Sequence, residues 1–330
     1  MDALIDTDVD FDDYLAILYL LAHPDVNVVG ISVTGCGAAH LEKGFANLRN
    51  LLTVFDERVQ GLPVLRGAKA PLRYSNVFPS WVREPANAHY NIRFPSLNPS
   101  PPLPGRASDW IATTLKRRSE PLDILLLGGG TNLALAFQQL TVEERRRSIR
   151  RIIMMGGNLL PEYVDPGARG NVLDTLGATP YYTNQVAEWN IFIDVKAAQD
   201  VIESGIPVEL ITLNACNDVP ITAPLVDQLR RIDTLPAKLI CDILDHPEIQ
   251  KGIDSHLHFW DPLAATVLVK PSLVKTQRFS VRIEQALNEE HDTSGKVIID
   301  DDHGSTITIA LSADREAVIE EFVTPIKAFR

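Results

Sequence analysis

The start of the chain concentrates acidic residues that could hold a cation. Five aspartates fall within eight positions: Asp6, Asp8, Asp10, Asp12 and Asp13. Carboxylates packed this closely repel one another, and their oxygens suit the hard cations Ca²⁺ and Mg²⁺. A solvated acidic loop with helix-capping aspartates is the alternative, because charge runs are commonly just solvated. The run follows a short apolar segment, residues 3–5, that predicts a strand. An open α/β sheet binds ligands at the carboxyl ends of its strands, so this position favours a cation site.

Two known cation-dependent patterns match this run poorly or only in part. An EF-hand loop beginning at Asp6 needs Gly at its sixth position and Glu at its twelfth, where the chain has Phe11 and Ile17. A phosphotransferase of the haloacid dehalogenase type begins with a strand and D-x-D, as this run does, but Asp10 stands where Thr or Val is usual. Such an enzyme also needs an acidic pair further along the chain, for which residues 300–302 are only a weak candidate. The EF-hand is excluded, and the phosphotransferase remains a weaker alternative.

Further motifs along the chain resemble those of the nucleoside hydrolase family. The first predicted strand and the following pattern D-x-D-x-x-x-D-D match the opening of that family. Later segments resemble its T-N-L-A, M-G-G, E-W-N and D-P-L-A motifs in the expected order: residues 131–134, 155–157, 188–190 and 261–264. The match is collinear over residues 3 to 265. The resemblance implies a Rossmann-like α/β fold and hydrolysis of an N-ribosyl bond.

The resemblance also implies one bound Ca²⁺ and a catalytic base. The family's cation ligands fall on Asp8, Asp13, Asp261 and the backbone carbonyl of Thr131, an oxygen-rich set that Ca²⁺ prefers. Asp8 is the implied general base toward a water that the cation orients, and this water attacks the anomeric carbon. Cleavage of a glycosidic bond passes through an oxocarbenium-like transition state, which surrounding carboxylates would stabilise.

The family's substrate contacts can be carried over residue by residue. The implied positions are Asp12, Asn190 and Asp261 for the 2′- and 3′-hydroxyls, Glu188 and Asn171 for the 5′-hydroxyl, and Met155 of the M-G-G motif. Sixteen residues separate Asn171 from Glu188, which is more than is usual in the family. Asn184 is therefore the alternative candidate for the second 5′-hydroxyl contact.

Two tryptophans indicate the class of base. Members of the family that use pyrimidines typically carry His directly before the late Asp, and this chain has Trp260 there. Trp260, with Trp81 from a long early loop, resembles the purine-specific branch that prefers inosine, adenosine and guanosine, in which two indoles sandwich the base. Such stacking can raise the basicity of the purine N7, so that solvent protonates the leaving group. His256 and His258 lie nearby in sequence, but an isolated H-x-H is a weak signal.

The expected activity is therefore Ca²⁺-dependent hydrolysis of purine ribonucleosides to free base and ribose. A nucleoside- or ribose-binding protein without turnover is the alternative from another class, although the retained Asp8, Asp13 and Asp261 favour an enzyme. The resemblance implies a homodimer or homotetramer. Two departures from the family pattern are Asp10, where Gly or Asn is usual, and Cys36, where Asn or Asp is common.

The elements that must position these residues alternate between short apolar runs and helical patterns. The runs predict strands at residues 3–5, 26–33, 124–127, 152–155 and 208–213, with helical stretches between them. This alternation predicts one domain over residues 1–330, an open and mostly parallel sheet with helices on both faces. Residues 73–104 and 158–190 interrupt the rhythm as long, proline- or glycine-punctuated segments.

Composition limits the partners. The 31 Lys and Arg against 43 Asp and Glu give a net charge of −12, which argues against nucleic acid or an anionic membrane surface as partner. Three widely spaced cysteines exclude a disulfide framework and fit a reducing compartment. The longest early apolar run, residues 14–22, is too short to span a bilayer. We expect a cytoplasmic protein whose partner is a small molecule.

Overall fold

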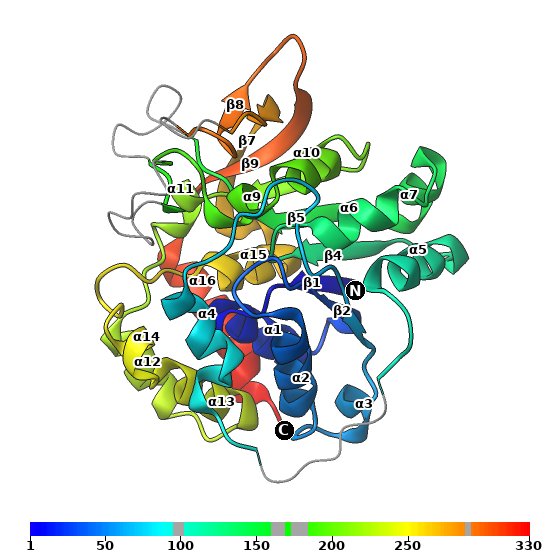
Figure 1. Cartoon of the computed structure of the whole chain (residues 1–330). Coiled ribbons are helices and arrows are strands. Elements are labelled where there is room, and N and C mark those ends of the chain that lie inside the picture. Colours follow the sequence, from blue (N-terminus) through cyan, green and yellow to red (C-terminus); the bar gives the residue numbers. More distant parts are fainter. Residues whose placement is uncertain (95–101, 160–168, 173–183, 288–291) are drawn as a thin grey trace.

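The sheet is the framework of the molecule. The computed structural model describes residues 1–94, 102–159, 169–172, 184–287 and 292–330, and within them nine strands form one sheet in the order β3-β2-β1-β4-β5-β6-β9-β7-β8 (Figure 1). The strands are β1 (Asp2–Thr7), β2 (Asn27–Val33), β3 (Val64–Arg66), β4 (Leu122–Leu126), β5 (Ile149–Met155), β6 (Val208–Ile211), β7 (Val274–Ile283), β8 (Val297–Ile299) and β9 (Ser305–Ala313). Seven of these pair in parallel, and β7 and β8 add antiparallel strands at one edge. The predicted α/β fold with a mostly parallel sheet is confirmed.

Helices cover both faces of the sheet (Figure 1). Along β1, Ile5 contributes to one apolar cluster and Leu4 to the other, because successive side chains of a strand point to opposite faces. The first cluster includes α1 (Phe11–Ala22), α2 (Leu41–Leu52), α11 (Leu213–Cys216), α12 (Ala223–Arg230), α13 (Leu235–Leu244), α15 (Trp260–Val269) and α16 (Arg315–Ala328). The second includes α5 (Ala107–Arg117), α6 (Thr131–Phe137) and α10 (Val195–Ile202).

Shorter helices complete the described part of the chain. They are α3 (Glu57–Gln60), α4 (Ser80–Asn87), η1 (His89–Asn91), α7 (Val142–Ser148), α9 (Trp189–Ile193), α14 (Pro247–Gln250) and η2 (Pro271–Leu273). The predicted loop at residues 73–104 thus contains a helix, α4, whose single buried residue is Ala86. An exposed helix with an internal proline, Pro85, leaves little apolar periodicity in the sequence, which is why the pattern predicted no helix there. Among the described residues, no helix is long and apolar enough to cross a membrane.

The strand order reverses between β1 and β4. The chain moves outward from β1 to β2 and β3, then returns to place β4 on the other side of β1. At such a switch point the loops leaving neighbouring strands diverge and open a crevice at their carboxyl ends. The acidic loop follows β1, and Gly128–Gly130 follow β4, so both lie at this crevice.

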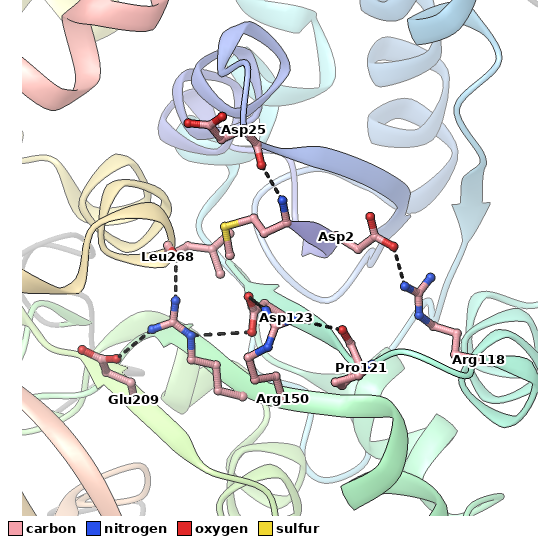
Figure 2. A network of polar contacts seen from close by, with 10 residues as sticks. Asp2, Asp25, Arg118, Pro121, Asp123, Arg150, Glu209 and Leu268 are labelled. Atoms are coloured by element: carbon pink, nitrogen blue, oxygen red, sulfur yellow. Dashed lines mark hydrogen bonds and ion pairs between the residues drawn. The ribbon is translucent and has the colours of Figure 1, made fainter.

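Ion pairs join neighbouring strands at the amino ends of the sheet, opposite the crevice. Asp123 at the start of β4 is fully buried, and its carboxylate lies 2.8 Å from Arg150 Nη1 and 3.6 Å from Arg151 Nε (Figure 2). Arg151 also lies 3.7 Å from Glu209 of β6 and donates to the carbonyl of Leu268 in α15. The arginine charges offset the burial of this carboxylate, and the network joins β4, β5 and β6 at their amino ends, away from the crevice.

Candidate active site

The floor of the crevice is a cluster of three buried carboxylates. Asp12 and Asp13 lie in the first turn of α1, and Asp261 lies in the first turn of α15. One carboxylate oxygen from each lies within 4.8 Å of the others, and none of the three residues exposes more than 7% of its surface. Because α1 and α15 pack against each other, residues 249 positions apart in the sequence meet at one point.

The loop that leads into α1 is held by its own polar groups. Val9 has φ of 66°, a left-handed conformation that a β-branched residue adopts only where the surroundings enforce it. The hydroxyl of Thr7 accepts a hydrogen bond from the Val9 amide and donates to the Asp13 carboxylate. Asp10 caps α1: its side chain accepts from the Phe11 amide at 2.7 Å, and its own amide donates to Asp13 at 2.9 Å. The cluster is therefore built into the start of the helix.

Asp8 lies beside this cluster and contacts Asp13. Its Oδ2 accepts a hydrogen bond from the Ala38 amide at 3.1 Å. The carboxylate also fills the space next to Gly37, where a Cβ would lie 1.6 Å from Oδ2. The loop between β2 and α2 therefore clasps Asp8 on one side and leaves it open to the cavity on the other.

Asp6 lies behind the floor and supports it. Its Oδ1 accepts from Ser32 at 2.5 Å and from the side-chain amide of Asn132 at 2.8 Å. Asn132 in turn accepts from the Ala68 amide at 2.7 Å, so it ties β1 to the segment after β3. Burial raises the pKa of Asp6 to about 6. Asp6 is fully buried and is not among the residues that line the cavity.

The electrostatics of the floor favour a bound cation. Burial, with the charge of Asp10, raises the pKa of Asp8 to about 7. Burial, with the charges of neighbouring aspartates, raises the pKa of Asp12, Asp13 and Asp261 well above the ordinary range. Asp261 Oδ1 is buried and has no hydrogen-bond partner among the described residues. An all-oxygen set with an unpaired oxygen fits Ca²⁺.

The sequence assigned the cation to Asp8, Asp13, Asp261 and the Thr131 carbonyl. Carboxylate oxygens of Asp12, Asp13 and Asp261 all lie within 4.8 Å of one another, so Asp12 joins the candidate ligands. Thr131 is fully buried as the first residue of α6, and its hydroxyl donates to Asp194 at 2.7 Å. The individual ligand roles remain predictions.

The predicted ribose contacts lie at the next strand end. Glu188 caps α9, and its carboxylate accepts from the amides of Asn190, Ile191 and Gly157 at 2.8, 3.2 and 3.0 Å. Burial raises its pKa to about 7. The Asn190 side chain donates to the carbonyls of Leu127 at 3.0 Å and Met155 at 3.3 Å, which joins the ends of β4 and β5. Both Glu188 and Asn190 line the cavity.

The two asparagines considered for the 5′-hydroxyl differ in position. Asn171 lines the cavity, and its Oδ1 accepts from the Trp189 amide at 3.2 Å. Asn184 is fully buried and donates to Asp292 and to the Ser294 carbonyl, at 3.1 and 2.8 Å. Asn184 is not among the cavity-lining residues. Asn171 therefore lines the cavity, whereas Asn184 does not.

Aromatic side chains form the walls of the cavity, whose volume is about 1080 Å³. Trp260 is half-buried, with its ring edge-on to Phe11 at 6.2 Å between centroids. Trp81 in α4 is 53% exposed and lines the same cavity. Phe78 and Trp189 also line it and stack on each other at 4.1 Å. An acidic floor under aromatic walls suits a sugar with an attached flat base.

Sequence reasoning did not assign several of these wall residues. Phe78 and Trp189 were visible only as an aromatic in a long segment and as the middle residue of E-W-N. His256 and His258 both line the cavity, and the His258 ring lies 6.0 Å from that of Trp260. Tyr90 lines it as well. An aromatic ring within three residues of a site residue was the one signal that could have indicated Phe78, Trp189 and His258.

Comparisons with known proteins agree with this geometry. The family model for the inosine-uridine preferring nucleoside hydrolase matches residues 3–320. The pyrimidine-specific ribonucleoside hydrolase RihA of Salmonella typhimurium is 28% identical over 330 residues, covering 96% of this chain and 95% of that protein. The structure of a purine-preferring ribonucleoside hydrolase from Gardnerella vaginalis has a TM-score of 0.80 and 27% identity, covering 99% of this chain and 98% of that one.

A plant nucleoside hydrolase, PpNRh1, shares the fold with a TM-score of 0.82 at 22% identity, over 99% of each chain. The match of the family model extends over nearly the whole chain, including the acidic loop and the late Asp261. The chain belongs to the inosine-uridine preferring nucleoside hydrolase family.

Proposed function

We propose that this protein, as one domain over residues 1–330, hydrolyses the N-glycosidic bond of purine ribonucleosides with Ca²⁺ as cofactor. The observation that carries the proposal is the cluster of Asp12, Asp13 and Asp261 at the floor of a cavity whose walls include Trp81 and Trp260. The products are the free base and ribose.

The residues of the site divide the reaction between them. Asp12, Asp13 and Asp261 would hold the Ca²⁺ ion, which when bound would supply a positive charge that orients and acidifies a water. Asp8 lies beside this cluster, lines the cavity and accepts the proton from the attacking water. The ribosyl group gains positive charge as the bond to the base breaks, and the buried carboxylates of the floor stabilise it. Glu188, Asn171 and Asn190 fix the sugar over Asp8 by hydrogen bonds to its hydroxyls.

The base class is the finer part of the proposal. RihA is named pyrimidine-specific and the Gardnerella enzyme purine-preferring, so the relatives' names point in both directions. Trp260 directly precedes Asp261 and faces the cavity, and Trp81 lies on another wall. Two indoles offer stacking surface for a two-ring base and no acid for a pyrimidine, which favours purines.

A panel of nucleosides tests both the hydrolysis and the preference for purines. Purified protein is incubated with inosine, guanosine, adenosine, uridine and cytidine, and reducing sugar is measured with Ca²⁺ and with a chelator. We expect release from the purine nucleosides that the chelator abolishes. If uridine released reducing sugar at a rate comparable to inosine, the purine preference would be rejected, while the assignment as a nucleoside hydrolase would stand. Absence of release from all five, with nucleoside still bound, would favour a nucleoside-binding protein without turnover.

Replacement of Trp260 tests the stacking. Each stacked base is worth about 1–3 kcal/mol, so Trp260→Ala should lower kcat/KM for inosine about 5- to 150-fold. Trp110→Ala is the matched control, because Trp110 is partly buried against the other apolar cluster, away from the cavity. Unchanged inosine kinetics in Trp260→Ala would remove stacking from the proposal.

A further inference from the structure

A left-handed turn follows helix α4. His89, Tyr90 and Asn91 have φ values of 53°, 50° and 62°, three consecutive residues in the region that favours glycine. Each such residue costs about 1–2 kcal/mol, so the turn persists only where surrounding contacts enforce it. Backbone strain of this kind is commonly found at functional sites, where the contacts of the side chains maintain it.

The side chains of this turn reach across to α1 and to the start of α14. Tyr90 is 3% exposed, with its ring edge-on to Tyr14 at 6.4 Å and to His246 at 5.6 Å. The His89 ring lies 4.8 Å from that of Tyr14. The Tyr90 hydroxyl donates to Oδ1 of Asp10, the residue that caps α1. The strained turn thus places one phenol on Asp10, next to the aspartates of the acidic floor.

The floor side of this hydrogen bond is rigid. All twelve residues of α1 are buried, and the Asp10 side chain and backbone amide are already fixed on Phe11 and Asp13. The other side is less constrained, because Ala86 is the only buried residue of α4. Two hydrogen bonds hold α4 on the side of α2. Asn47 of α2 donates to the Ala86 carbonyl at 3.0 Å, and Arg83 of α4 donates at 3.1 Å to the carbonyl of Gly35, in the loop before α2. The hydrogen bond from Tyr90 to Asp10 holds residues 80–91 on the side of α1.

We propose that Tyr90 is a positioning residue, whose hydrogen bond to Asp10 holds residues 80–91 against the acidic floor and so sets the distance from Trp81 to a bound base. Tyr90, Asp10 and Trp81 all line the cavity. This role gives Asp10, the extra carboxylate of the acidic run, a function outside cation binding. The inference rests on the proposed hydrolysis only for its kinetic consequence.

Tyr90→Phe tests the inference because it keeps the ring and removes the hydroxyl alone. We expect KM for inosine to rise about tenfold, the weight of one hydrogen bond to a charged group, with kcat within about twofold. Tyr19→Phe is the matched control: the Tyr19 hydroxyl donates to Glu321 at 3.1 Å at the far end of α1. Its KM should equal that of the unsubstituted protein.

Hydrogen exchange provides a readout that needs no substrate. Amides of residues 80–91 should exchange about tenfold faster in Tyr90→Phe and at the unchanged rate in Tyr19→Phe. Asp10→Asn retains an oxygen acceptor and should exchange more slowly there than Asp10→Ala. Unchanged exchange in Tyr90→Phe, or an unchanged KM beside faster exchange, would overturn the inference. Absence of nucleoside hydrolysis in the unsubstituted protein would reject the proposed function, while the exchange data would still decide the role of Tyr90.

Discussion

Gly37→Ala should disable the site without replacing a catalytic residue. A Cβ at Gly37 would lie 1.6 Å from Oδ2 of Asp8 and 2.4 Å from its Cγ. Real Cβ atoms essentially never approach closer than 3.0 Å, so the carboxylate must shift by about 1.4 Å. The backbone of Gly37 has no left-handed φ, so its conformation is compatible with alanine, and the close contacts are with the Asp8 side chain, including its Cβ at 2.5 Å. The substitution therefore acts by displacing Asp8.

The size of the effect follows from that shift. Misplacement of a catalytic group by about 1 Å can cost about 100-fold in rate, close to 2.7 kcal/mol of activation free energy. We expect kcat for inosine to fall by at least this factor, and the hydrogen bond from the Ala38 amide to Asp8 to be lost. The assay is steady-state release of reducing sugar, with circular dichroism and thermal unfolding to verify the fold.

Two controls isolate the cause. Gly61→Ala adds the same methyl group at an exposed helix end with φ of −80°, and should leave kcat unchanged. In an Asp8→Ala background, Gly37→Ala should cause no further loss of kcat, because the carboxylate that it displaces is already absent. A folded Gly37→Ala protein whose kcat lies within threefold of the unsubstituted value would refute the reasoning.

Two further predictions concern stability. Because burial and neighbouring charges raise the pKa of Asp12, Asp13 and Asp261, the cation-free folded protein binds protons that the unfolded chain has already released, and its stability should fall as pH rises above about 4. Added Ca²⁺ should then raise Tm more at pH 7.5 than at pH 5 by calorimetry, and equal shifts would contradict this. Asp123→Ala should lower the free energy of unfolding in urea by about 2–3 kcal/mol, because the Asp123 carboxylate is fully buried. Asp2→Ala, which removes a more exposed carboxylate, should cost less than about 1 kcal/mol, and similar losses would count against a special role for the buried carboxylate.

Elements with strong local patterns were predictable from the sequence. The runs at 26–33 and 152–155 correspond to β2 and β5, because strands buried in a parallel sheet are continuously apolar. The antiparallel strand β7 was not predicted, since most of its residues are exposed or half-buried and form no apolar run. Its place between β9 and β8 depends on pairings with residues 305–313 and 297–299, which local periodicity does not encode.

The sequence by itself determined the acidic loop, its place after the first strand and the family, because these depend on the identity and order of residues along the chain. Only the tertiary structure decided which oxygens meet. It brought Asp261 to Asp12 across 249 positions, set Tyr90 on Asp10 and placed Gly37 against Asp8. Such contacts arise when α1, α15 and the loops of neighbouring strands pack at the carboxyl ends of the strands. Packing is a property of the whole core, so no local segment specifies it.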